Sequence, residues 1–148
     1  MNLSEKIIES CNNTFPMFGY ELEYLSENTE RNLNSTEDVN ILIGLSNSVQ
    51  GNVVISFKME TALNIISAMM GGMEVIEIDD MGKSALGEMA NMVMGSAISG
   101  LSQDGVIDLS PPTIAIGKDT YIMISNIEAN KMHFILADHS MYVAYALQ

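Results

Sequence analysis

The sequence has one cysteine, no tryptophan, and only six lysine and arginine residues among 148 positions. The single cysteine, Cys11, excludes an internal disulfide, and a reduced cytoplasmic setting is the simplest prediction. Six scattered cations do not form a convincing basic patch, so we predict no binding to nucleic acid. The formal net charge of −13 also disfavours electrostatic docking to anionic membranes. A protein or a small molecule is therefore the expected partner.

Long apolar runs are missing as well. No stretch approaches the roughly 20 residues that a membrane-spanning helix needs, so we expect no membrane insertion. Residues 1–10 carry Glu5, Lys6 and Glu9 among isolated aliphatics, which is not the pattern of a signal peptide. The hydrophobic fraction of 47% and charged fraction of 17% are typical of a globular chain, and we expect one domain over residues 1–148.

The beginning of the chain predicts a helix. Apolar residues recur at helical spacing from Leu3 to Phe15, and Pro16 and Gly19 then end the pattern. Cys11 lies on the apolar stripe, which predicts a buried small hydrophobe and not a nucleophile.

The remainder of the chain predicts two more helices and a set of strands. Residues 21–38 are polar and weakly periodic, which suggests a strand and then a loop, with 32–38 exposed. The later elements are strands at 39–45 and 51–57, helices at 60–70 and 80–101, and strands at 113–116, 121–125, 132–137 and 141–147, with a turn at 138–140. This order predicts an α+β fold, in which an N-terminal helix and two further helices pack on a largely antiparallel sheet.

The helix predicted over residues 80–101 is the most informative element. At about 100° per residue, Ser84, Glu88 and Asn91 lie on one side, each one turn from the next. Small residues continue this stripe: Gly95, Ser99 and Ser102. Apolar residues take the opposite side: Leu86, Ala90, Val93, Ala97 and Leu101. A merely solvated face usually carries Lys and several Glu, so the small residues suggest that another molecule approaches closely.

Glu88 and Asn91 have the chemistry of half a catalytic site. A carboxylate pairs with a cation, and a carboxamide orients a water or a carbonyl. Neither group is a strong nucleophile, so a partner has to complete the site. A Glu-x-x-Asn spacing also arises by chance, and a solvated helix face is the alternative when the motif is taken alone.

Other common sites are not evident in the sequence. It contains no Gly-x-Gly-x-x-Gly, Walker or Gly-x-Ser-x-Gly motif. His133 and His139 are too few and too far apart for a zinc site without a cysteine pair, so we expect no metal of the chain's own.

Several features resemble the CheX branch of the CheC/CheX/FliY phosphatase family. They are the element order, the hairpin strand over 51–57, the helix end over 68–72, and Ser84-x-x-x-Glu88-x-x-Asn91. The resemblance covers nearly the whole chain and implies hydrolysis of the aspartyl phosphate of a CheY-type response regulator. It implies that Glu88 pairs with the regulator's lysine beside the phosphoaspartate, and that Asn91 positions the attacking water. The regulator would supply Mg²⁺, and this chain would need no cofactor.

The resemblance also implies how partners are arranged. Ser84, Met92, Gly95 and Ser99 would contact the regulator, with Met81 and Met92 flanking the stripe. The Ser-x-x-x-Glu-x-x-Asn pattern occurs once, which fits CheX, and a homodimer joined through the sheets is expected. Response regulators are often acidic too, so recognition would depend on short-range fit and not on long-range attraction.

The family pattern has a proline downstream of the Asn, and Pro111 and Pro112 are the candidates. Two other hypotheses stay open at this point. One is a non-catalytic binding module for a receiver domain or another signalling protein, and the other is a structural dimerisation domain.

Overall fold

The computed structural model describes residues 2–101 and 105–148. The helices are α1 (Leu3–Thr14), α2 (Met59–Met69) and α3 (Asp80–Ser99), and a short 3-10 helix η1 (Phe15–Phe18) follows α1. The strands are β1 (Leu22–Glu30), β2 (Leu33–Ser35), β3 (Val39–Asn47), β4 (Gly51–Phe57), β5 (Ile107–Leu109), β6 (Thr113–Ile116), β7 (Ile122–Ser125), β8 (Ala129–Leu136) and β9 (His139–Leu147).

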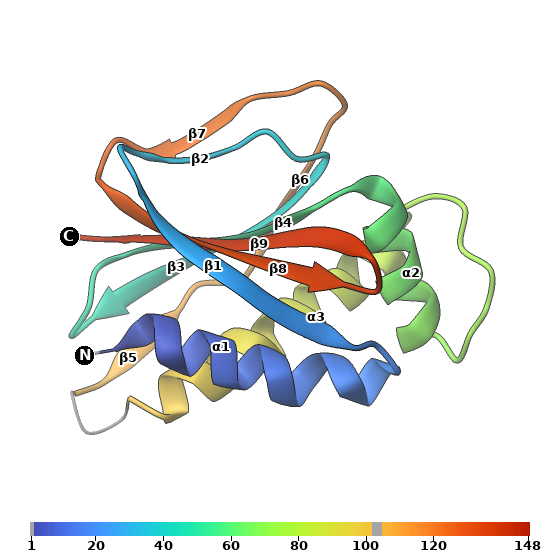
Figure 1. Cartoon of the computed structure of the whole chain (residues 1–148), viewed down its shortest axis with the longest axis horizontal. Helices are drawn as coiled ribbons and strands as arrows, with labels where there is room; N and C mark the ends of the chain where they lie inside the picture. The colour runs from blue at the N-terminus through green and yellow to red at the C-terminus, as the bar shows by residue number, and fades with distance from the viewer. Residues whose placement is uncertain (1, 102–104) are drawn as a thin grey trace.

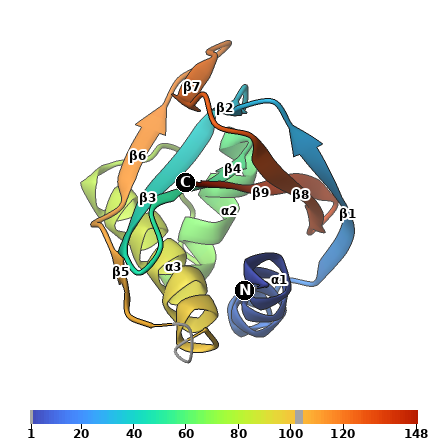
Figure 2. The same cartoon turned by 90° about the vertical axis from the view of Figure 1, so that its left-hand side faces the viewer.

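A seven-stranded sheet forms the centre of the described structure. Its order is β1-β8-β9-β4-β3-β5, with β6 also paired to β3, and every pairing is antiparallel. The helices lie on one face of this sheet, and the small β2–β7 sheet lies over the other (Figure 1). Seen from the side, α1 and α3 run next to each other below the strands (Figure 2). The predicted α+β class with a largely antiparallel sheet is confirmed.

Alternating apolar side chains explain why the strands bury one face under the helices. In β4, Val53, Ile55 and Phe57 point into the main core. The apolar side of α3 fills the same core, and each residue predicted for this side is buried, including Leu101 just beyond the end of the helix: Leu86, Ala90, Val93, Ala97 and Leu101. Cys11 is buried there as well, as predicted, and burial raises the pKa of its thiol to about 12.

The prediction that residues 32–38 are exposed is wrong in part. Leu33 and Ser35 are buried in β2, which pairs with β7 far along the chain. Leu33 packs with Val54 and Ala144 on the sheet face away from the helices. A three-residue strand has too little alternation to be read locally, and its burial depends on this distant pairing.

Smaller differences concern where elements end. The last hairpin turns at Ala137 and Asp138, both at positive φ, so His139 and Ser140 belong to β9 and not to the turn. Helix α3 ends at Ser99, two residues before the predicted end. Strand β5 was not predicted. No helix among the described residues is long and apolar enough to cross a membrane.

Candidate active site

The start of α3 is fixed by its own residues. The Oδ1 atom of Asp79 accepts a hydrogen bond from the backbone N–H of Gly82 at 2.8 Å, which caps the helix. Asp80 adds negative charge in the first turn, where the helix dipole favours it. A Cβ atom at Gly82 would lie 3.1 Å from Cδ1 of Ile66, so glycine lets the first turn pack closely on α2. These contacts set the direction in which the rest of α3 runs.

One side of α3 is held against the core, and this orients the opposite side outward. The Oγ atom of Ser10 in α1 donates a hydrogen bond to the backbone carbonyl of Val93 at 2.6 Å. Ser84, Glu88 and Asn91 lie on the outward side and are exposed. Within the described residues, no hydrogen bond or ion pair engages these three side chains. The fold therefore leaves them available to a partner.

A hollow of about 460 Å³ lies beside these side chains. It brings together the three predicted residues, one of the two candidate prolines and three residues that the sequence analysis did not assign to the site. The lining consists of Lys83, Ser84, Gly87, Glu88, Asn91, Pro112 and Ile114. The acid and the amide therefore border a surface depression formed by two separate segments of the chain.

Pro112 forms the wall opposite the helix. It immediately precedes β6, part of which lies close to α3. Gly87 is buried at the contact, and a Cβ atom there would lie 3.1 Å from Cγ of Pro112. Of the two candidate prolines, Pro112 lines the hollow, while Pro111 is exposed and does not. The glycine directly before Glu88 was the available sequence signal, because a small residue permits close packing there.

The rest of the predicted stripe continues past the hollow. Nothing lies within 4 Å of a Cβ atom built on Gly95, so the backbone is open to approach there. The Oγ atom of Ser99 donates a hydrogen bond to the carbonyl of Gly95 at 3.0 Å. Met92 is half-buried beside the stripe. These three residues do not line the hollow, and Ser102 lies outside the described residues.

The two histidines have local partners away from α3. Nε2 of His133 lies 2.9 Å from Oγ of Ser140, and its ring stacks on Tyr142 with centroids 4.6 Å apart. Nε2 of His139 lies 3.6 Å from a carboxylate oxygen of Glu60. In the part of the chain that the structure describes, no three His, Cys, Asp or Glu residues gather in a way that could hold a metal ion.

The charges at the hollow suit an ionic partner. Glu88 presents an exposed carboxylate, and Asn91 follows one turn later, about 4.5 Å along the axis. Lys83 adds an ammonium whose Nζ lies 3.9 Å from a carboxylate oxygen of the fully exposed Asp80, so this surface pair is weak. Glu88 can pair with a cation, Asn91 can hydrogen-bond to a water, and Lys83 can attract an anion. The site offers no strong nucleophile.

A family model described as "Chemotaxis phosphatase CheX" matches residues 39–135 of the chain. This segment is more than half of the 148 residues and contains both Glu88 and Asn91. The chain therefore belongs to the CheX family.

Individual relatives agree with this family. The chain is 42% identical over 82 residues to the CheY-P phosphatase CheX of Thermotoga maritima, which covers 55% of this chain. The aligned part is about half of that relative's own length, 53%.

Solved structures show the same fold. A CheX chemotaxis protein from Desulfovibrio desulfuricans superposes with a TM-score of 0.88 at 20% identity, over 100% of both chains. A chain of the CheX–CheY–BeF3–Mg²⁺ complex from Borrelia burgdorferi gives a TM-score of 0.81 at 24% identity, over 99% of this chain and 95% of that one. These likenesses establish the fold.

Proposed function

We propose that this protein hydrolyses the aspartyl phosphate of a CheY-type receiver domain. The observation that carries the proposal is the exposed pair Glu88 and Asn91, which borders a hollow and has no partner among the described residues. The Thermotoga maritima relative, a CheY-P phosphatase, and the Borrelia burgdorferi complex with CheY support the choice of partner.

In the proposed mechanism the two chains share the work. The receiver holds its phosphoaspartate and Mg²⁺, which neutralises the developing phosphoryl charge. Glu88 pairs with the receiver's lysine and fixes the angle at which α3 enters. Asn91 then holds a water in line with the phosphorus. The water oxygen bonds to phosphorus as the bond to the aspartyl oxygen breaks, which releases inorganic phosphate and a free carboxylate. Catalysis is mainly positioning.

Turnover separates this proposal from a binding module. An enzyme accelerates phosphate loss when it is far less abundant than the phosphorylated receiver, whereas a binder cannot act beyond its own amount. The decisive experiment uses a CheY-type receiver that has been phosphorylated with acetyl phosphate and then desalted. Loss of its phosphoryl group is followed in the presence of one molecule of this protein per roughly 50 receivers. We expect all of the receiver to decay faster. Binding of the receiver without faster phosphate loss would contradict the proposed phosphatase activity and favour the non-catalytic binding module.

The proposal includes a homodimer acting in the cytoplasm. Strand β1 is an edge of the sheet, and it carries the exposed side chains Tyr24 and Leu25. Unpaired edge strands are natural sites for pairing with a second copy. Light scattering at several concentrations is expected to give twice the mass of the chain. A single-chain mass at every concentration would exclude the dimer.

A further inference from the structure

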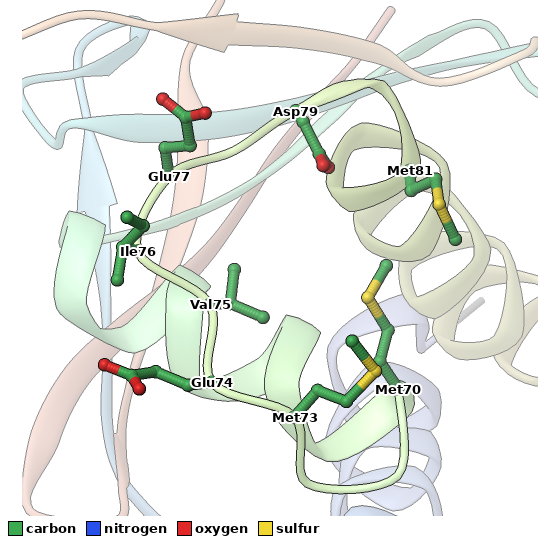
Figure 3. Close-up of a pocket in the computed structure, with 8 residues that line it drawn as sticks. All are labelled: Met70, Met73, Glu74, Val75, Ile76, Glu77, Asp79 and Met81. Atoms are coloured by element: carbon green, nitrogen blue, oxygen red, sulfur yellow. The ribbon is translucent and has the colours of Figure 1, made fainter.

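A second depression lies next to the candidate site, at the beginning of α3. It encloses about 490 Å³ between the α2–α3 loop and the first turn of α3 (Figure 3). Met70, Met73 and Met81 gather on one side of this loop pocket, and Val75 points into it (Figure 3). Met73 is 65% exposed and Met81 is 68% exposed. The fold gains little from the side chains of Met73 and Met81, so these two are free to contact another molecule.

The loop pocket is preformed because its loop is tied down. The Oγ atom of Ser67 donates a hydrogen bond to the carbonyl of Met73 at 2.6 Å. The N–H of Gly72 donates to the carbonyl of Ser67 at 2.8 Å. Gly71 and Gly72 have φ of 75° and 89°, a backbone shape that favours glycine. The Asp79 cap fixes the other end of the loop. A partner therefore spends little free energy on ordering the loop.

The loop pocket and the candidate site share one face of α3. Met81 precedes Glu88 by seven residues, two helical turns, so the two side chains lie on the same side about 10 Å apart along the axis. A standard interface buries about 800 Å² on each partner, a patch about 16 Å in radius. A patch of that radius centred on Glu88 and Asn91 is large enough to include the loop pocket.

The residues that line the loop pocket also indicate which chemical groups of a partner it can bind. The acidic residues of the lining are Glu74, Glu77 and Asp79, and the lining contains no lysine or arginine. The carboxylates of Glu74 and Glu77 lie at the rim, on the side of the loop away from the methionines (Figure 3). An apolar side chain would bury itself among flexible methionines, which adapt to its shape. A neighbouring lysine or arginine would meet the carboxylates.

We propose that the receiver domain docks an apolar side chain, flanked by a lysine or arginine, in the loop pocket while its phosphoaspartate faces Asn91. This inference rests on the proposed function for the identity of the partner. The loop pocket supplies binding free energy and the candidate site supplies chemistry. Loss of the loop pocket therefore raises KM and leaves kcat unchanged.

The test is the double variant Met73→Ser and Met81→Ser, compared with Met123→Ser. Both pocket residues are well exposed, so the double variant is expected to fold with an unchanged Tm. Met123 is 52% exposed on β7, across the sheet from α3 (Figure 1), and serves as the matched control. We expect the double variant to raise KM for the phosphorylated receiver at least tenfold, with kcat within twofold of wild type. The control is expected to keep the KM of wild type.

A binding measurement makes failure of this inference distinguishable from failure of the proposed function. The receiver loaded with BeF3 and Mg²⁺ is titrated into each variant, and the same tenfold rise in Kd is expected for the double variant. This rise would support the loop pocket even if wild type showed no turnover. A KM and Kd equal to those of wild type would overturn it. The inference would also be overturned if the double variant lost self-association but still bound the receiver as wild type does. The loop pocket would then be occupied by a second copy of this chain.

Discussion

Replacing Gly95 with alanine is predicted to stabilise the fold and, at the same time, to weaken binding of the phosphorylated receiver. Gly95 lies inside α3, and a Cβ atom there meets nothing within 4 Å. A methyl group at such a helical position stabilises the fold by about 1 kcal/mol, because glycine loses more backbone entropy on folding. For a chain of this size the gain corresponds to a rise in Tm of about 3 °C.

The effect on partner binding has the opposite sign. If the receiver's backbone approaches the stripe closely at Gly95, the new methyl group crowds it at a cost of about 1–3 kcal/mol. KM for the phosphorylated receiver then rises at least about fivefold, since each 1.4 kcal/mol is tenfold.

Thermal unfolding and steady-state decay of the phosphorylated receiver give the two readouts. Gly87→Ala is the comparison for stability, because its Cβ atom would lie 3.1 Å from Cγ of Pro112. We expect crowding there to cancel the helical gain. A Tm for Gly95→Ala equal to or below wild type would refute the open helix geometry. A raised Tm with an unchanged KM would refute close approach at this position.

Three further predictions follow from single side chains. Glu88→Lys is expected to raise Kd for the BeF3-loaded receiver at least tenfold by placing like charges together, and unchanged affinity by titration would exclude the lysine contact. Lys83→Gln is expected to raise KM a few-fold, more at low salt than at high salt, because the lost ammonium lines the hollow that receives the anionic phosphoryl group in the proposed mechanism; an effect independent of salt would argue against this electrostatic role. Burial raises the pKa of Cys11 from 9.0 to about 12, so its stabilising contribution is complete below pH 9 and is lost as pH rises towards 12. Urea unfolding of wild type and Cys11→Ala between pH 8 and 11 is expected to show the steeper loss of stability in wild type, and parallel curves would contradict the burial.

The parts of this fold that could be predicted from sequence are those with a clear local period. The alternation in β4 and the helical stripe of α3 each predicted the correct element and the face that packs into the main core. The position of β2 could not be predicted, because three residues carry no reliable period and Leu33 is buried only through its pairing with β7.

The candidate site also contains residues that could be predicted from the sequence and residues that could not. Ser84, Glu88 and Asn91 are related by helical geometry, so sequence was enough to place them together. Pro112 reaches the hollow because β6 pairs with β3, a contact that no local pattern encodes. The methionine-lined loop pocket depends on how the α2–α3 loop folds back on Ser67, which spacing along the chain does not reveal.

The central claim is that Asn91 positions the attacking water, and Asn91→Ala tests it most directly. The side chain is exposed and contributes little to packing, so the variant is expected to keep the Tm of wild type. Asn64→Ala is the matched control, an exposed asparagine on α2 that does not line the hollow.

Decay of the phosphorylated receiver is measured with catalytic amounts of wild type, Asn91→Ala and Asn64→Ala. We predict that Asn91→Ala lowers kcat about a hundredfold, while Kd for the BeF3-loaded receiver changes little and Asn64→Ala behaves as wild type. Full activity in a folded Asn91→Ala variant would contradict the mechanism proposed for this site.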